Sequence, residues 1–114
     1  MRTLLFLSIG PLLLLSCNRK AAPLSGLPPC LQQSIAAWQA EGHCEDPWAE
    51  EYLFQGKKVY VLRHGTCGAD MTDNVLDENC KLLGRLGGFV GNMTINGAPF
   101  SNAQHRKVLW KAKP

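Results

Sequence analysis

The sequence lacks the residue spacings that mark most metal and catalytic sites. Neither a Cys-x-x-Cys nor a His-x-x-x-His pattern occurs, and the three histidines, His43, His64 and His105, are scattered. A Gly-x-Ser-x-Gly pattern is missing, and no lysine-threonine pair follows the glycines to make a phosphate-binding loop. The sequence therefore predicts no metal, no cofactor and no catalytic residue, although a triad assembled in space would escape this test.

A calcium loop and a nucleic-acid surface are also missing. Carboxylates crowd the segment from Asp70 to Glu78, but their spacing lacks the alternating ligands and central glycine of an EF-hand, so a solvated loop is the simpler interpretation. Of the 12 Lys and Arg, Arg2 lies in the expected leader, and the remaining eleven barely exceed the nine Asp and Glu. Such a small excess excludes a typical nucleic-acid binder.

Charge is nevertheless uneven along the chain. Acidic residues gather between Glu41 and Glu51, and basic residues between Arg106 and Lys113. Two solvated faces, or a sheet edge protected by lysines, explain this pattern. A docking patch is the alternative.

The longest apolar run, Leu4 to Leu15, is too short to span a membrane, which takes about 20 residues. With Arg2 before it, the run predicts a signal peptide over residues 1–16. The four residues Leu14-Leu15-Ser16-Cys17 resemble the lipobox of bacterial lipoproteins, which implies that Cys17 carries diacylglycerol and palmitate. An ordinary secretory signal that ends near a cysteine is the alternative.

The anchor sets the expected location and domain boundaries. Two or more acyl chains on Cys17 give stable membrane attachment. Asn18 stands where an aspartate would resemble an inner-membrane retention signal, so we expect outer-membrane attachment facing the periplasm. Residues 17–27 form the lipidated cysteine and a flexible tether, and residues 28–114 form one domain.

The other four cysteines form an even set, which in a small exported domain predicts disulfides. Three pairings are open. We favour Cys30 with Cys44 and Cys67 with Cys80, because each closes a short loop worth about 3 kcal/mol. A metal site is the competing interpretation.

Apolar spacing predicts an α+β fold, with an N-terminal helix on a four- to five-stranded antiparallel sheet. Leu31, Ile35 and Trp38 form one stripe of a helix of about thirteen residues, which opens at Pro28-Pro29 and ends at Gly42. The expected strands are 52–55 and 58–63, joined at Gly56-Lys57, then 75–77, 80–83 around Glu78-Asn79, and 108–110, with a turn at Asn96-Gly97.

The two tryptophans near the helix receive different roles. We expect Trp38 to pack against the sheet near Val59 and Val61, with its indole N–H bonded at the rim. Trp48 follows Pro47 in the acidic loop and is the better candidate for an exposed ligand contact.

Four sequence blocks carry a family resemblance: Gly56 to Val61, Cys67 to Asp70, Cys80 with Leu83-Gly84, and Leu86 to Asn92. They resemble recurring blocks of small bacterial lipoproteins that form an uncharacterised family, a domain of unknown function. The resemblance covers about Pro29 to Trp110. It implies an exported, lipid-anchored α+β domain and transfers no catalytic residue.

These features predict a non-enzymatic binding or inhibitory module at the cell envelope, held by Cys17 and recognising an envelope protein or glycan. A small envelope hydrolase that uses His64 or His105 is the alternative, and a structural subunit of an envelope assembly is another. A convergent pocket with buried polar groups would favour the enzyme, and an exposed apolar patch would favour the binding module.

Overall fold

The computed structural model describes residues 24–113, so the predicted signal peptide and Cys17 lie outside the described residues. Leu24 and Leu27, which the sequence places in the tether, pack against the core. Gln32 fixes this turn because its side-chain amide donates to the Leu27 carbonyl at 2.8 Å. No helix within residues 24–113 is long and apolar enough to cross a membrane.

Helix α1, Pro29–Ala40, starts and ends close to the predicted positions. Pro28 takes the N-cap position, and Pro29 lies in the first turn. Proline is tolerated there because the N–H that it lacks would have no hydrogen-bond partner within the helix. The buried residues of the helix are Leu31, Ile35 and Trp38, as their spacing predicts.

Five antiparallel strands form one sheet in the order β4-β3-β2-β1-β7. Their bounds are Trp48–Phe54 for β1, Lys57–Arg63 for β2, Thr72–Asp77 for β3, Leu82–Gly87 for β4 and Gln104–Lys111 for β7. The predicted α+β fold with a central strand at 58–63 is confirmed. The β1–β2 turn lies at Gln55-Gly56, one residue earlier than predicted, because these two residues adopt positive φ.

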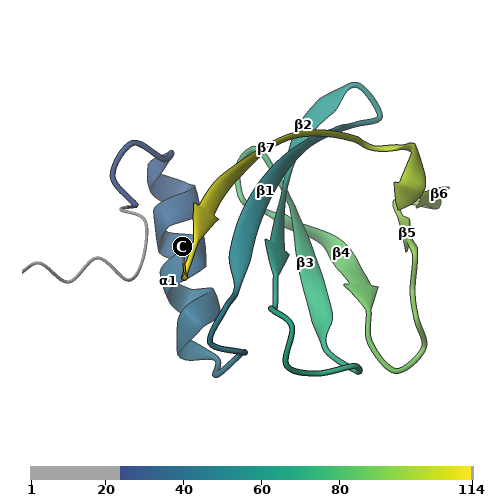
Figure 1. The fold of residues 1–114 in the computed structure, drawn as a ribbon. Helices are drawn as coiled ribbons and strands as arrows, with labels where there is room; N and C mark the ends of the chain where they lie inside the picture. Colours follow the sequence, from purple (N-terminus) through teal and green to yellow (C-terminus); the bar gives the residue numbers. More distant parts are fainter. Residues whose placement is uncertain (1–23, 114) are drawn as a thin grey trace, which may run out of the picture.

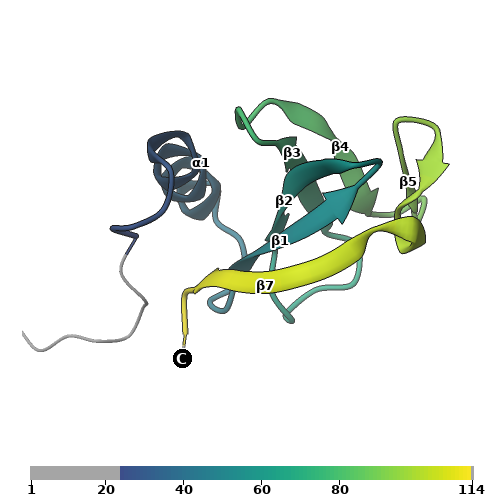
Figure 2. The ribbon, with the colours of Figure 1, turned by 90° about the horizontal axis from the view of Figure 1, so that it is seen from above.

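A short ribbon completes the fold. Strands β5 (Thr94–Ile95) and β6 (Ala98–Pro99) pair across the predicted Asn96-Gly97 turn, and the 3-10 helix η1 (Phe100–Asn102) leads into β7. Helix α1 lies along one side of the sheet and the β5–β6 ribbon along the other (Figure 1). The view from above shows the same separation (Figure 2).

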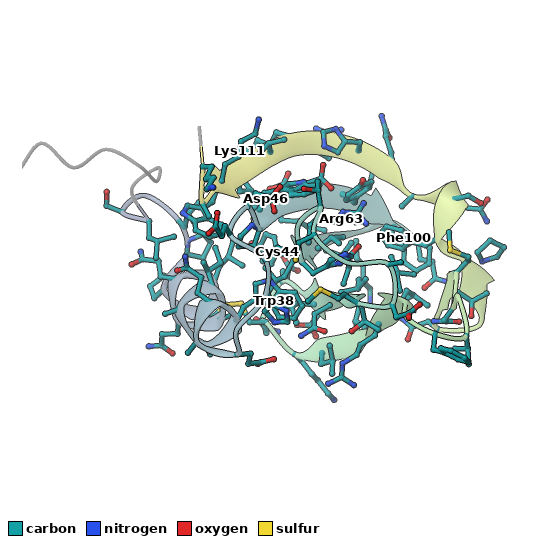
Figure 3. All side chains as sticks on the ribbon, turned by 60° about the horizontal axis from the view of Figure 1, so that its bottom comes forward. Trp38, Cys44, Asp46, Arg63, Phe100 and Lys111 are labelled. Atoms are coloured by element: carbon teal, nitrogen blue, oxygen red, sulfur yellow. A yellow bond between two sulfur atoms is a disulfide. The ribbon has the colours of Figure 1, made fainter. Side chains whose placement is uncertain are left out.

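Each side of the sheet has its own apolar core. The core on the helix side contains Leu31, Ile35 and Trp38 of α1. The sheet residues that pack against them are Ala49, Tyr60, Leu62, Leu76 and Trp110. The other side gathers Phe54, Val59, Val61, Val75, Leu86, Ile95 and Phe100. Figure 3 shows Phe100 far from α1.

The predicted contact of Trp38 with Val59 and Val61 is wrong. Alternate residues of a strand face opposite sides of a sheet, and the helix covers the side of Tyr60 and Leu62. The expected hydrogen bond is present, since the Trp38 indole N–H donates to the Arg63 carbonyl at 3.4 Å.

All four domain cysteines form disulfides, but the favoured pairing is wrong. Cys30 bonds Cys80, and Cys44 bonds Cys67. The helix opposes a Cys30–Cys44 bond, because the ten helical residues that follow Cys30 carry the chain about 15 Å away, whereas bonded cysteines need Cα atoms within about 7 Å. Strand β3 separates Cys67 from Cys80 in the same way.

Candidate functional site

The loop between β4 and β5 presents two consecutive apolar side chains to solvent. Phe89 is 90% exposed and Val90 is 85% exposed, and Met93 beside them is 63% exposed. The loop is closed at its base, where the Gly87 and Asn92 N–H groups each donate to the other residue's carbonyl, at 2.7 and 3.0 Å. It projects from one end of the sheet, away from α1 (Figure 1). We call Phe89 and Val90 the loop tip.

Glycine and asparagine fix the shape of this loop. Gly88 and Gly91 have φ of +78° and +64°, a region that side chains with a Cβ rarely adopt. The Asn92 side-chain amide donates to the carbonyls of Arg85 at 2.6 Å and Thr94 at 2.9 Å, and so ties the loop to both strands. The tip is therefore held in one shape before any partner arrives.

Arg63, the last residue of β2, centres a network of charges on the side of the sheet away from α1 (Figure 3). Its Nε donates to Glu50 at 2.8 Å, its Nη1 to Asp73 at 3.0 Å and its Nη2 to the Tyr52 hydroxyl at 2.8 Å. The Tyr52 hydroxyl in turn donates to Glu50 at 3.3 Å. Three strands are cross-linked because β1, β2 and β3 each contribute a member.

Two histidines extend the network at its ends. His64 Nδ1 lies 2.6 Å from Asp73, which also accepts the His64 backbone N–H at 2.9 Å. His105, on β7, places Nε2 at 3.2 Å from Glu50. The structure thus separates the two candidate histidines, His64 and His105, onto opposite ends of one network and brings a carboxylate to each.

Glu50 stays ionised in this setting. Burial raises the pKa of its carboxyl, but the hydrogen bond and positive charge of Arg63 outweigh burial, and a Trp48 hydrogen bond adds to them, so the pKa lies below the usual range. A carboxyl whose pKa is depressed by folding stabilises the protein above its unfolded pKa, about 4.3 for Glu. That stability is lost as the pH falls through the lower folded value.

We expect Glu50→Gln to lower the free energy of unfolding by about 2 kcal/mol at neutral pH, since it removes charged hydrogen bonds. The deficit should shrink at an acidic pH below the folded pKa of Glu50, where the wild-type carboxyl is protonated too. Urea titrations at both pH values measure this difference, with Glu78→Gln, an exposed turn residue, as the control. A deficit that is the same at both pH values would contradict the ionised role of Glu50.

The acidic segment from Asp70 to Glu78 divides between two tasks and forms no single loop. Asp73 belongs to the Arg63 network, while Asp77 caps the β3–β4 turn by accepting the backbone N–H groups of Asn79 and Lys81 at 2.8 and 2.9 Å. Within residues 24–113, no group of three potential metal ligands gathers.

The Cys44–Cys67 disulfide joins two loops at the same end of the sheet. Beside it, Asp46 accepts the Thr66 hydroxyl at 2.6 Å and the Thr66 N–H at 3.0 Å. Gly65 between them has φ +110°, and a Cβ there would collide with the side chains of Cys44 and Asp46. The position therefore requires glycine.

Sequence reasoning missed the loop tip and the Arg63 network. The glycines from Gly84 to Gly91 lack the pattern of a phosphate-binding loop, and the sequence analysis gives no role to the two apolar residues between them. The sequence does carry a signal for the tip, which is the adjacent apolar pair Phe89-Val90 with glycines on both sides. A pair bracketed in this way does not follow the alternation of a strand that would bury one of its side chains. The network has no local signal, because its members meet through strand pairing.

One family model matches the chain over residues 39–112, and its description is Domain of unknown function (DUF6970). The matched range includes all seven strands, the loop tip and the Arg63 network. No curated protein and no solved structure matches the chain.

Proposed function

The chain belongs to the family described as Domain of unknown function (DUF6970), and we propose that it is an exported, lipid-anchored, non-enzymatic binding module of the bacterial cell envelope. Cys17 provides the anchor, with outer-membrane attachment facing the periplasm. The loop tip provides the contact with a protein partner.

The exposure of Phe89 and Val90 is the observation that carries this role. Burying such side chains is worth about 1.5–3 kcal/mol each, and the fold leaves that free energy unused. Apolar residues that cluster on an otherwise hydrated surface are characteristic of contact sites. Because the loop is fixed by Asn92 and by two glycines, little conformational entropy is lost when a partner binds.

The shape of the tip favours a protein over a glycan. A phenyl ring and an isopropyl group on a projecting turn are matched by an apolar recess, which protein surfaces offer and hydrated glycan strands do not. The two disulfides suit an exported domain of this size, since they stabilise a small core in an oxidising compartment.

A hydrolase is the second candidate, favoured by the His64–Asp73 contact, because a carboxylate on Nδ1 orients the imidazole of many catalytic histidines. The neighbouring groups weigh against it. The Cys67 sulfur is held in a disulfide, and the Thr66 hydroxyl donates to Asp46. Within residues 24–113 no polar or charged residue is buried as a whole, although single polar atoms of His43 and Asn74 are.

The experiment is photo-crosslinking in intact cells, with a benzophenone analogue of phenylalanine at position 89. We expect one discrete protein adduct in the membrane fraction, and loss of that partner from pull-downs of a Phe89→Ser/Val90→Ser variant. The matched control carries the same analogue at Leu82, which is also exposed and lies on the neighbouring β4. In the same cells, a palmitate analogue should label the wild type and not Cys17→Ala.

Equal adducts at positions 89 and 82, or adducts with lipid alone, would overturn the role of the tip. A Cys17→Ala protein that still takes up the label and stays in the membrane fraction would overturn the anchor. The serine variant is expected to have the same melting temperature as the wild type, because neither replaced side chain is buried.

A further inference from the structure

A groove separate from the loop tip lies at the opposite edge of the sheet, where β7 ends beside the segment before β1. It has a volume of about 470 Å³ and is lined by Asp46, Trp48, Val108, Lys111 and Lys113. Loop tip and groove belong to different edge strands, because β4 and β7 terminate the sheet on opposite sides. The proposed partner contact therefore leaves the groove unexplained.

Strand register builds the apolar floor of this groove. Trp48 is paired with Lys111, and Glu50 with Val108, so these side chains share the side of the sheet away from α1. Trp48 is half-buried and Val108 is 43% exposed, although the floor of an ordinary sheet edge would carry polar side chains. An indole face next to an isopropyl group offers a flat apolar surface.

The rim of the groove carries two lysines and the carboxylate of Asp46. Lys113 is paired with Glu45 at 2.8 Å, whereas Lys111 makes no salt bridge within residues 24–113. Figure 3 shows Lys111 on β7 on the same side of the molecule as Asp46. A negatively charged group on a ligand that rests on Trp48 would meet the Lys111 ammonium group.

Asp46 supplies hydrogen-bond acceptors on the same rim. Hydrogen bonds from the Thr66 hydroxyl and backbone hold the pKa of Asp46 below its usual range, so the carboxylate stays ionised. Each of its oxygens accepts one bond from Thr66, and a carboxylate oxygen has a second lone pair. Hydroxyl donors of a ligand can therefore bind Asp46 without displacing Thr66.

From these features we propose that the groove binds a sugar ring that carries a carboxylate. Such a ring has an apolar face for Trp48 and Val108, hydroxyl donors for Asp46 and an anion for Lys111. A neutral sugar leaves Lys111 without a partner, and a simple aromatic acid leaves Asp46 without one. Sugar acids combine an apolar ring face, hydroxyl donors and a carboxylate.

Titration of the full-length protein in zwitterionic micelles with glucuronate and with glucose tests this site. The two sugars share a ring and differ at one carbon, which is a carboxylate in one and a hydroxymethyl group in the other. The readout is the NMR shift of the Trp48 indole N–H, with the Val108 amide as a second reporter. We expect glucuronate to bind about fivefold more tightly than glucose, the size of one solvent-accessible ion pair. Added salt should reduce this preference.

Variants separate the roles of the lining residues. Lys111→Gln should bring glucuronate to the affinity of glucose, while Lys107→Gln, which removes a lysine of β7 outside the groove, should leave the preference unchanged. Trp48→Ala should abolish the shifts at Val108 with both sugars. Equal affinity of wild type for the two sugars, shifts confined to other surfaces, or equal effects of the two lysine variants would overturn the proposal.

Discussion

Removal of the Cys30–Cys80 disulfide is expected to lower the free energy of unfolding by about 4 kcal/mol, the chain-entropy value for a sequence separation of 50 residues. The bond joins the first turn of α1 to the β3–β4 turn, so its loss also frees the helix at one end. Since a domain of this size has a total stability on the order of 5–10 kcal/mol, the variant should lie close to unfolding.

A Cys30→Ser/Cys80→Ser double variant avoids leaving a reactive thiol, and thermal and urea unfolding measure the loss. The matched comparison is Cys44→Ser/Cys67→Ser. Its separation of 23 residues predicts a smaller loss of about 3 kcal/mol. Mass spectrometry of the unreduced, proteolysed protein gives the pairing directly. Peptides that link Cys30 to Cys44 would contradict the fold, and a larger loss in the second variant would contradict the entropic ranking.

Trp38→Ala is expected to cost about 3–5 kcal/mol, the range for truncating a large buried aromatic residue. The Trp38 side chain is 3% exposed, lies in the helix-side core with Leu62 and Trp110, and stacks on the His43 ring at 3.8 Å. The substitution also leaves the Arg63 carbonyl without its indole donor. For a domain of this length the melting temperature should fall by more than about 12 °C.

Trp48→Ala is the control, because Trp48 is half-buried at the start of β1 and contributes to neither core cluster. Its melting temperature should fall by only a few degrees. If the two variants rank the other way, helix α1 does not cover the sheet as described, and Trp38 becomes the candidate ligand contact.

Elements with strong local patterns were predictable from the sequence. The spacing of Leu31, Ile35 and Trp38 gave the helix and its buried face, and the apolar run at 59–62 gave the central strand. The predicted ends of strands were less accurate where the strands contain polar residues. Strand β3 begins at Thr72, inside the predicted loop, and its Asp73 forms an ion pair with Arg63 of the neighbouring strand.

Properties that depend on which elements meet were not predictable in the same way. The side of the sheet that α1 covers is set by packing, and the sequence therefore predicted Val59 and Val61 as neighbours of Trp38 where the structure has Tyr60 and Leu62. The disulfide pairing was different, since the predicted helix already kept Cys30 and Cys44 too far apart to bond. The short closed loop favours a Cys30–Cys44 bond, but the rigidity of the intervening helix opposes it. The Arg63 network required the register of β1, β2 and β3.

The two disulfides flank α1, one in its first turn and the other beyond its C-terminal end, and both lead into the sheet. Tension applied to the chain before Pro29 would therefore pass through the Cys30–Cys80 bond into the β3–β4 turn, and would not peel the helix away one turn at a time. The applied force would then act as shear between neighbouring strands of the sheet. A protein held by its N-terminal end would keep its sheet folded under a pull that strips an unlinked surface helix.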